Sequence, residues 1–297
     1  MTGVAVVVPA YNAEAHLADA LHSALNQTHP AREIIVIDDG STDRTATIAR
    51  EFGENLTVIS QSNHGVSASR NLGILRSCSE FVAFLDADDL WHPRKLELQM
   101  AALAKHSDAP FVFNDIVPFA DSPPFSDPAG TEAHAMRVDL FPELFRHNSV
   151  HCSSVLARRE ALAHAGLFDV DQRGAEDMDL WLRLSVLAAP VKTKAVLSGL
   201  RQHPQRTTKS IRFVHEKLKA FEMMMLRWKS EADCVVELQV LARNDSEFLA
   251  YAYAESGDFA AAKELFLKTA RWGKKPIKNR LKAVQMHFKR SARGQQI

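Results

Sequence analysis

The sequence predicts an α/β protein in which helices flank a mostly parallel central sheet, with a helical appendage at the C-terminal end. In the first hundred residues, short runs rich in β-branched residues alternate with longer segments of helical periodicity, which is typical of β-α-β units. Beyond about residue 205 the apolar residues keep an almost uninterrupted helical spacing. We therefore expect a sheet domain over residues 1–205, with halves 1–110 and 111–205, and a helical region over residues 206–297.

The first strand is predicted at residues 4–8, an apolar run that Pro9 closes. Asn12 is expected to cap the helix that follows, because Asn is a favoured N-cap and apolar residues then recur at helical spacing through Leu25. These features predict the first β-α unit.

The second strand is predicted at residues 33–37 and ends in the polar, glycine-containing turn 38–43. A helix over about 44–52 and a third strand at 56–60 follow. A further helix is expected from Gly65 to about residue 76.

The fourth strand is predicted at residues 81–85, directly before Asp86-Ala87-Asp88-Asp89. Pro93 then begins a helix that extends to about residue 106, since proline is tolerated in a first helical turn. The later expected elements are a long loop at 117–130, a short helix near 139–147, a strand near 153–157, helices near 160–165 and 176–184, and a helical hairpin at 248–272.

Polar segments follow the strands, at residues 9–12, 38–43, 63–71 and 86–89. Ligands of open parallel sheets bind outside the carboxyl ends of the strands, so we expect these four segments to converge on one site.

Asp86, Asp88 and Asp89 place three carboxylates within four residues, where they repel one another unless a cation or solvent intervenes. Hard oxygen ligands suit Mg²⁺ or Mn²⁺. The competing interpretation is a solvated acidic turn before the next helix.

Three other positions carry polar chemistry that the residues alone leave open. A carboxylate of Asp38 or Asp39 can accept from a pyrimidine imide or from ribose hydroxyls, or can close an Asx turn with its own loop. Tyr11 can stack on a base or simply pack. Arg70 suits a bidentate phosphate contact, with an ion pair as the alternative.

Six motifs together resemble, in order and spacing, the family 2 glycosyltransferases with a GT-A fold. The resemblance covers about residues 3–205. The motifs are Pro9-Ala10-Tyr11-Asn12, Ile37-Asp38-Asp39-Gly40-Ser41-Thr42-Asp43, Asn63-x-Gly65, Arg70-Asn71, Leu85-Asp86-Ala87-Asp88-Asp89 and Glu176-Asp177-Met178-Asp179-Leu180-Trp181.

This resemblance implies a nucleotide-diphosphate sugar donor, usually UDP-linked, bound by the half at residues 1–110. By the family pattern Tyr11 and Asp39 contact the uracil, and Asp86 lies on the ribose and metal side. The donor-binding residues that it implies are Pro9, Tyr11, Asp39, Asn63, Arg70 and Asp86. The implied ligands of Mn²⁺ or Mg²⁺ are Asp88, Asp86 and His203, the last from an Arg201-x-His203 element.

The half at residues 111–205 is implied to bind the acceptor. Asp177 resembles the family's catalytic base, which removes the acceptor proton during one in-line displacement with inversion. Glu176 assists or binds acceptor, and Asp179 is the reserve candidate for the base. His151 and Cys152 are expected to serve ordinary packing, because nothing in the sequence nearby favours a thiolate at Cys152.

The expected activity is the extension of a bacterial surface polysaccharide, lipopolysaccharide or glycolipid by an inverting, metal-dependent hexosyltransferase. One alternative is a sugar-phosphate nucleotidyltransferase, which would want a glycine-rich basic loop after the first strand; Pro9-Ala10-Tyr11-Asn12 does not provide it. The other is a non-catalytic scaffold, against which the intact Asp86, Asp88 and Asp177 argue.

Composition narrows the protein class further. Apolar residues make up 46% of 297 residues, enough for a sizeable core. The three cysteines lack metal-site or disulfide spacing, and no apolar run is long enough to span a membrane, so we expect a cytoplasmic protein.

Charge divides the chain. Residues 1–200 hold 16 lysines and arginines against 26 acids, and residues 201–297 hold 20 against 10. Residues 271–293 carry nine basic residues and no acid, which predicts peripheral binding to an anionic membrane surface, or alternatively a solvated tail. Nucleic acid is not expected as a partner, because no aromatic platform accompanies the charge.

Residues 246–271 resemble one tetratricopeptide-type helical pair, which we expect to serve packing or homodimer formation.

Overall fold

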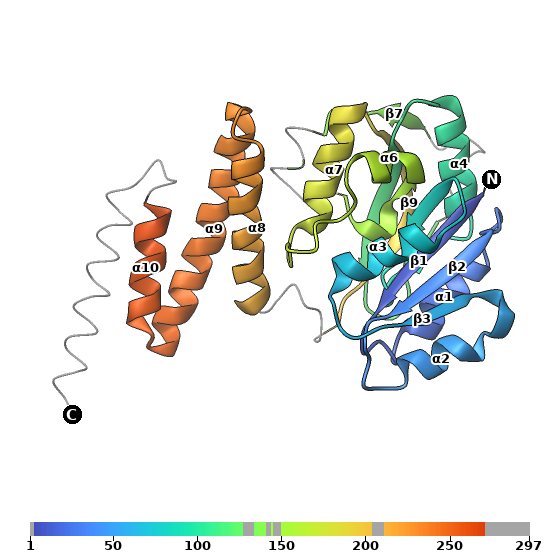
Figure 1. Cartoon of the computed structure of the whole chain (residues 1–297), viewed down its shortest axis with the longest axis horizontal. Coiled ribbons are helices and arrows are strands. Elements are labelled where there is room, and N and C mark those ends of the chain that lie inside the picture. The colour runs from blue at the N-terminus through green and yellow to red at the C-terminus, as the bar shows by residue number, and fades with distance from the viewer. Residues whose placement is uncertain (1–2, 127–133, 141–143, 145–149, 204–210, 271–297) are drawn as a thin grey trace. The chain divides into compact units, whose positions relative to one another are not determined.

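The computed structural model describes residues 3–126, 134–140, 144, 150–203 and 211–270. The chain divides into two compact units (Figure 1). The sheet unit comprises Met1–Leu144, Asn148–Asp171 and Glu176–Gln205. The helical unit comprises Phe145–His147, Gln172–Ala175 and Arg206–Ile297.

Four parallel strands build the first half of the sheet. In spatial order they are β3 (Thr57–Ser60), β2 (Glu33–Asp38), β1 (Val4–Ala10) and β4 (Phe81–Phe84). Every residue of β1 is buried, which explains why this strand is a continuous apolar run rather than an alternating one. The predicted parallel β-α-β arrangement is confirmed here.

The second half of the sheet is mixed. It adds β8 (Leu156–Arg158), β6 (Phe111–Phe119), β9 (Val191–Arg201) and β5 (Leu90–Trp91), and β7 (Ala135–Arg137) pairs with β9. β8 runs antiparallel to both β4 and β6, whereas β6 and β9 are parallel. The described residues thus form a sheet of nine strands.

The sequence analysis missed β9 and wrongly placed Val117–Phe119 in a loop. In the structure these three residues pair with the end of β9. β8 pairs with β6 only at Phe111 and Val112, so Pro118 lies where β6 has a partner on one side, and a strand tolerates proline there. The prolines therefore concealed the strand.

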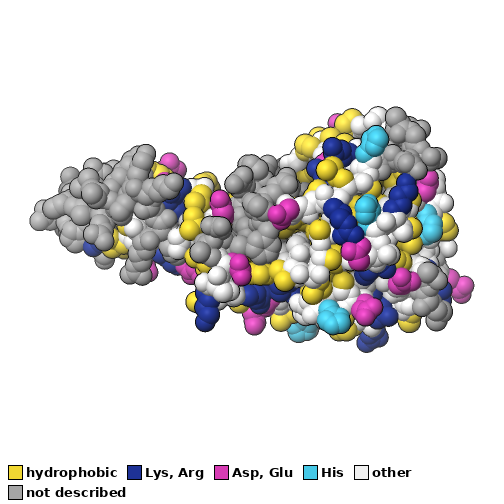
Figure 2. Space-filling model, turned by 90° about the horizontal axis from the view of Figure 1, so that it is seen from above, with side chains coloured by type: hydrophobic (Ala, Val, Ile, Leu, Met, Phe, Trp, Pro, Cys, Tyr) yellow, Lys and Arg dark blue, Asp and Glu magenta, His cyan; other side chains and the backbone are white. Residues whose placement is uncertain are grey.

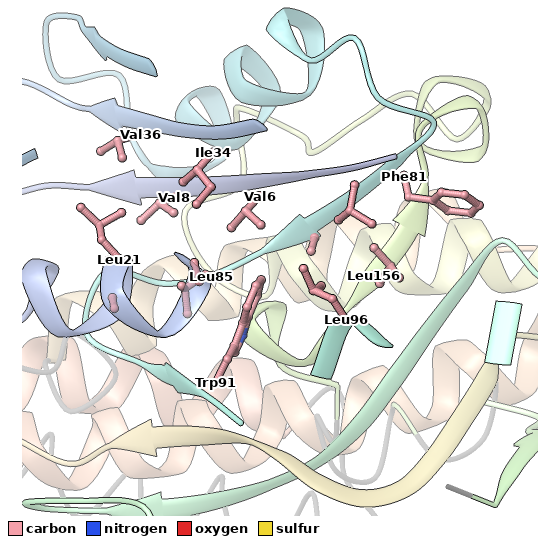
Figure 3. Packing of buried hydrophobic residues seen from close by; sticks show 14 of the residues in the cluster. Val6, Val8, Leu21, Ile34, Val36, Phe81, Leu85, Trp91, Leu96 and Leu156 are labelled. Carbon is pink, nitrogen blue, oxygen red and sulfur yellow. The ribbon is translucent and has the colours of Figure 1, made fainter. Parts of the chain in front are cut away.

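Helices cover both faces of the parallel strands. α1 (Leu17–Leu25), α2 (Thr45–Glu51) and α4 (Lys95–Lys105) contribute to one core with Val6 and Val8 of β1 (Figure 3). α3 (Val66–Arg76) packs on the opposite face, where a Cβ on Gly73 would lie 2.3 Å from Val7 Cγ1. Only glycine permits so close a contact between helix and strand.

The predicted N-cap at Asn12 is wrong. α1 begins at Leu17 with His16 at its N-cap position. Asn12 has a φ of 49° and bonds to the loop after β2 instead, because the left-handed conformation is readily adopted by asparagine.

Later elements follow the prediction more closely. The strand predicted near 153–157 begins only at Leu156, because Cys152–Ser154 form a short 3₁₀ turn, η2, before β8. A second 3₁₀ turn, η1 (Gly53–Asn55), precedes β3. α6 (Arg159–His164) and α7 (Glu176–Leu187) lie where helices were predicted. Most of the helix predicted near 139–147 falls outside the described residues.

The helical unit contains α8 (Ile211–Arg227), α9 (Ala232–Ser256) and α10 (Phe259–Thr269). α9 ends at Gly257, which has a φ of 88°, and the Asp258 side chain accepts from the N–H of Ala261 to cap α10. The helical hairpin predicted around Gly257-Asp258 is confirmed, since a left-handed glycine ends one helix and an aspartate starts the next.

Side chains of both charges cover the sheet unit. On the face shown in Figure 2, acidic, basic and histidine side chains are interspersed. Within the described part of the chain, no helix has both the length and the apolar character needed to cross a bilayer. The basic segment 271–293 lies outside the described residues.

Candidate functional site

The loops after β1 and β2 are bonded to each other at the carboxyl edge of the sheet. The N–H of Asn12 donates to Ser41 Oγ at 3.0 Å, and the N–H of Thr42 donates to Asn12 Oδ1 at 2.8 Å. The N–H of Asp39 also donates to the carbonyl of Ala10 at 2.8 Å. Tyr11 is held beside this junction with 53% of its surface exposed, so its ring is accessible to a ligand.

Asp38 and Asp39 form a clamp with 4% exposure each. Asp38 Oδ1 accepts from the N–H of Ser41 at 3.1 Å, so the Asx-turn interpretation is confirmed for Asp38. Asp39 Oδ1 accepts from the N–H of His64 at 2.9 Å, and Oδ2 accepts from the N–H of Gly65 at 2.8 Å. Asp39 thereby connects β2 to the loop that carries Asn63.

Gly40 brings the two loops into contact. Its φ is 76°, and a Cβ at this position would lie 2.9 Å from the backbone nitrogen of Asn63. Both the conformation and the space require glycine. Asn63 is exposed, directly beside the Asp39 clamp.

The acidic loop at residues 86–89 separates its three carboxylates. The side chains of Asp86 and Asp88 are each 31% exposed, whereas Asp89 is 2% exposed. Asp89 Oδ2 accepts from Ser153 Oγ at 2.5 Å, and Oδ1 accepts from the N–H of Arg201 at 3.2 Å. Burial, together with the charges of Asp86 and Asp88, raises the pKa of Asp89 well above its usual range. Asp89 therefore stabilises the fold, whereas the side chains of Asp86 and Asp88 are accessible to a ligand.

Arg70 connects the acidic loop to the start of α7. Its side chain is 5% exposed, with Nη2 at 2.8 Å from Asp86 Oδ1 and Nη1 at 3.0 Å from Glu176 Oε1. Its guanidinium carbon also lies 5.3 Å from the ring centroid of Phe168. A planar guanidinium can bridge two carboxylates in this way and a lysine cannot. The alternative interpretation of Arg70 was a surface ion pair; the structure shows an ion pair with two carboxylates, but a buried one.

Glu176 and Asp177 occupy the first turn of α7, where the helix dipole favours acids. Burial and the neighbouring Asp177 raise the pKa of Glu176, against the lowering effect of Arg70. Asp177 is partly exposed, and its Oδ1 accepts from the N–H of Met178 at 2.7 Å. The reserve candidate Asp179 has no exposed side-chain surface and pairs with Arg183 at 2.8 Å, so the geometry favours Asp177.

His203 lies against the acidic loop. Its Nε2 is 2.9 Å from Asp88 Oδ2, and its Nδ1 is buried with no hydrogen-bond partner among the described residues. Arg201 also contacts the acidic loop, since its Nε donates to the carbonyl of Asp88 at 2.9 Å. The Arg201-x-His203 element therefore reaches the acidic loop, as the resemblance implied.

His16 joins this cluster without having been predicted. Its ring centroid is 5.1 Å from that of His203. Burial, followed by the positive charges of Arg201 and His203, lowers the pKa of His16. No spacing pattern distinguished His16 from other residues before α1, so the contact between β1 and β9 regions could not be inferred from sequence.

The donor set fits a hard divalent cation that retains outside ligands. Asp88 offers a carboxylate and His203 an imidazole, and Asp88 Oδ2 lies 2.9 Å from His203 Nε2. Asp86 is on the same loop as Asp88. Among the described residues, no group of three or more His, Cys, Asp and Glu side chains is arranged to hold a metal ion by itself. Mg²⁺ and Mn²⁺ characteristically take one or two protein carboxylates and complete their coordination with water and phosphate oxygens.

Cys152 lies at the base of the site and is 2% exposed. Burial raises the pKa of its thiol well above the usual value, with the nearby Arg70 acting in the opposite direction. A thiol that stays protonated is a poor nucleophile, which agrees with the packing role expected for Cys152.

The sequence-predicted residues fall into two connected groups in the sheet unit. Pro9, Tyr11, Asp39 and Asn63 lie at the ends of β1 and β2, where Ala10 is in register with Asp38. The second group consists of Arg70, Asp86, Asp88, Glu176, Asp177 and His203, joined by the contacts given above. β1 pairs with both β2 and β4, so the two groups share one edge of the sheet.

The comparisons with known proteins identify the family. A model described as Glycosyl transferase family 2 matches residues 5–163, more than half of the chain. The chain belongs to glycosyltransferase family 2. It is 30% identical over 210 residues to an uncharacterised glycosyltransferase of Rickettsia typhi, a match that covers 69% of this chain and 65% of that protein.

A second relative comes from Bacillus subtilis and is described as a putative teichuronic acid biosynthesis glycosyltransferase, TuaG. It is 27% identical over 237 residues, covering 76% of this chain and 92% of TuaG. The chain thus spans about two thirds of the Rickettsia relative and nearly all of the Bacillus one.

Solved structures show the same fold. Residues 1–349 of S. aureus TarS in complex with UDP-GlcNAc superpose with a TM-score of 0.72 at 17% identity, covering 99% of this chain and 92% of that one. The mannosyltransferase PcManGT of Pyrobaculum calidifontis, in complex with GDP-Man and Mn²⁺, gives 0.60 at 19% identity, covering 98% and 87%. The predicted GT-A fold is confirmed.

Proposed function

We propose that this family 2 enzyme is an inverting, metal-dependent glycosyltransferase that moves a hexose from a nucleotide-diphosphate sugar to an acceptor hydroxyl. The arrangement of Arg70 carries the proposal. Its guanidinium binds Asp86, from the loop with Asp88, through one terminal nitrogen and Glu176, next to Asp177, through the other. A carboxylate loop suited to a cation and an acid suited to a proton transfer are thereby held together.

UDP is the proposed nucleotide. Tyr11 has an accessible ring that can stack on the base, and Asp39 can accept from the imide at Oδ2, which takes one protein hydrogen bond. Pro9 and Asn63 are proposed to line the same pocket. TarS is described in complex with UDP-GlcNAc and PcManGT with GDP-Man, which supports a nucleotide-sugar donor for this fold.

Asp88 and His203, assisted by Asp86, are proposed to hold Mn²⁺ or Mg²⁺. The bound cation would offset the negative charge that develops on the β-phosphate as the glycosidic bond breaks. Arg201 supports the same loop from behind through its bond to the Asp88 carbonyl. Arg70 stays a predicted phosphate contact, and its two carboxylate partners already fix the plane of its guanidinium.

Asp177 is the proposed base. The acceptor hydroxyl attacks the anomeric carbon from the face opposite the nucleotide, its proton passes to the Asp177 carboxylate, and the nucleotide diphosphate leaves in one displacement with inversion. Glu176 is less suited to this role, because Arg70 occupies its carboxylate and burial raises its pKa.

The proposed acceptor is a glycan or glycolipid of a bacterial surface polysaccharide, which the name of TuaG supports. The proposed division of the chain assigns residues 1–110 to the donor, 111–205 to the acceptor and 206–297 to a helical appendage for packing or dimerisation. The basic segment 271–293 is proposed to attach the enzyme peripherally to the inner face of an anionic membrane. Loss of vesicle co-sedimentation on removing residues 271–297 would support that attachment, and unchanged co-sedimentation would refute it.

A screen of nucleotide sugars tests the proposed function. Thermal shift with UDP-sugars and GDP-mannose, each with and without Mn²⁺, should show stabilisation that requires both nucleotide and cation. Transfer to an acceptor should then release the nucleoside diphosphate. Release of pyrophosphate from a sugar phosphate and a nucleoside triphosphate would instead identify a nucleotidyltransferase, and the absence of any Mn²⁺-dependent nucleotide binding would contradict the proposal.

A further inference from the structure

Ser153 bridges the two ends of the acidic loop. It lies in η2 and is 1% exposed. Its Oγ accepts from the N–H of Asp86 at 3.1 Å and donates to Asp89 Oδ2 at 2.5 Å. The N–H of Asp89 also donates to the carbonyl of Asp86 at 3.1 Å, closing the turn. One hydroxyl therefore joins the first and last residues of the loop.

Ser153 is itself fixed from the other side. Its carbonyl accepts from Trp91 Nε1 at 2.7 Å and from Ser198 Oγ at 2.8 Å. Trp91 is in β5 and Ser198 is in β9, so the carbonyl is held by the second half of the sheet. Ser153 is therefore a fixed attachment point for the two ends of the acidic loop.

The same support extends into the core. Asn114 Nδ2 donates to Ser198 Oγ at 3.1 Å, and Gln99 Nε2 donates to Asn114 Oδ1 at 3.0 Å. Lys95 Nζ, fully buried, donates to Gln99 Oε1 at 2.8 Å. Buried polar chains of this kind hold one geometry, because a broken member leaves its neighbours unsatisfied away from water.

From this geometry we infer that Ser153 is a positioning residue that sets the cation affinity of the acidic loop. The inference rests on the proposed function. Asp86 is one anchored end of the loop, and Asp88 lies between it and the other anchored end, Asp89. The side-chain directions of Asp86 and Asp88 therefore depend on the closure that Ser153 Oγ maintains. Without the hydroxyl, the Asp86 amide and the Asp89 carboxyl each lose a buried partner, and the turn relaxes to satisfy them.

The test compares Ser153→Ala with Ser154→Ala. Ser154 lies in the same 3₁₀ turn and is fully buried, but its Oγ donates to the carbonyl of His151 at 2.7 Å. Calorimetry with the full chain would measure Mn²⁺ binding in the presence of saturating UDP, and UDP binding without cation. Assays of transfer would separate the KM for Mn²⁺ from kcat.

Ser153→Ala should raise the Mn²⁺ dissociation constant about tenfold, while UDP binding without cation stays unchanged. Ser154→Ala should leave the Mn²⁺ dissociation constant within about twofold of the wild type. A Ser153→Ala protein with wild-type Mn²⁺ affinity would overturn the inference, and so would an equal weakening by both substitutions. If Ser153→Ala does not fold, Ser198→Ala should weaken Mn²⁺ binding by a smaller factor, and unchanged binding in that variant would overturn the inference.

Wild-type behaviour separates the two levels of the proposal. A wild-type protein without Mn²⁺-dependent UDP binding contradicts the proposed function itself. A wild-type protein that binds both, with Ser153→Ala unaltered, contradicts only the positioning role of Ser153.

Discussion

Two acidic turns lie at the same edge of the sheet and treat their carboxylates differently. In the turn after β2, Asp38 and Asp39 are almost fully buried and accept hydrogen bonds from the backbone of their own and the neighbouring loop. In the turn after β4, only Asp89 is buried in this way, and the Asp86 and Asp88 side chains keep 31% of their surface exposed.

The difference shows how a fold separates structural acids from acids that can bind ligands. A carboxylate whose oxygens accept several backbone donors stabilises the loop that supplies them, and a cation would have to displace those donors. A carboxylate held by one arginine or one histidine remains able to bind a cation or a phosphate-bound metal. In the turn after β2, substitutions should therefore affect stability, with an added effect on donor binding at Asp39. Substitutions after β4 and at α7 should affect turnover.

Asp177→Asn should have the largest effect, because it removes the proposed base. The substitution keeps the size of the side chain, and its oxygen can still accept from the N–H of Met178. We expect kcat to fall about a thousandfold, with donor affinity and thermal stability unchanged. Transfer assays measure kcat, and calorimetry on the same preparation measures donor affinity and thermal stability. Asp171→Asn, at an exposed position of the same unit, is the control and should keep wild-type kcat. Native turnover in Asp177→Asn would move the base elsewhere.

Arg70→Lys should have the next largest effect. Lysine keeps the charge but cannot bridge Asp86 and Glu176 with two parallel donors. We expect kcat/KM to fall about tenfold to a hundredfold, with a loss of about 3 kcal/mol in the free energy of unfolding, because one buried carboxylate is left unpaired. Denaturant unfolding and initial rates measure the two losses. Arg44→Lys, an exposed ion-paired arginine, should change neither.

Asp39→Asn and Asp38→Asn form a matched pair within the first turn. The two oxygens of Asp39 accept from Gln61, His64 and Gly65. An asparagine at residue 39 has only one oxygen and cannot accept all three bonds, so we expect a loss of about 2 kcal/mol in the free energy of unfolding. At residue 38 an Asn Oδ1 can keep the bond from Ser41, and Asx turns tolerate it, so the loss should be below about 0.5 kcal/mol. Equal losses would contradict the structural difference between the two residues.

Glu33 extends the structural class to the other end of β2, and its substitution should have a smaller effect than Asp39→Asn. Burial opposes its ionisation, but hydrogen bonds from Ser79, Ser77 and the backbone of Cys78 outweigh that effect and lower its pKa. A lowered folded-state pKa gives stability above the unfolded-state pKa that is lost as the pH falls through the folded-state value.

Glu33→Gln should therefore lower the unfolding free energy by about 1 kcal/mol at neutral pH and flatten its fall toward low pH, with turnover unchanged. Urea unfolding between pH 3 and 7, conditions chosen to span the titration of carboxyl groups, measures the effect. The exposed Glu54→Gln is the control and should leave the pH profile of stability as it is. A loss of turnover in Glu33→Gln would show that structural acids also affect the reaction.

The sequence predicts the parallel strands β1 to β4 well, because each is a short apolar run followed by polar residues. It also predicts which acids gather at the sheet edge. It does not reveal that Asp89 turns inward, since adjacent aspartates differ only in partners such as Ser153 and Arg201, which come from distant segments. The ion pair of Arg70 with Glu176 likewise joins two residues that lie 106 positions apart in the sequence.

The missed strand β9 has a similar cause. Its first residues, Val191-Lys192-Thr193-Lys194, give only a weak amphipathic pattern, and its pairing with β6 places Pro118 inside a strand. The same strand ends at Arg201, two residues before His203, and so brings both residues to the acidic loop. Tertiary pairing, which local patterns do not encode, therefore decides this side of the site.

Calorimetric titration of UDP into Asp88→Asn, with and without Mn²⁺, tests most directly whether the exposed carboxylates bind a cation and a diphosphate. The wild-type protein and Asp38→Asn should each bind UDP more tightly with Mn²⁺, and Asp88→Asn should bind UDP equally with and without it. An Asp88→Asn protein that keeps the wild-type gain from Mn²⁺ would contradict the assignment of the acidic loop as the cation site.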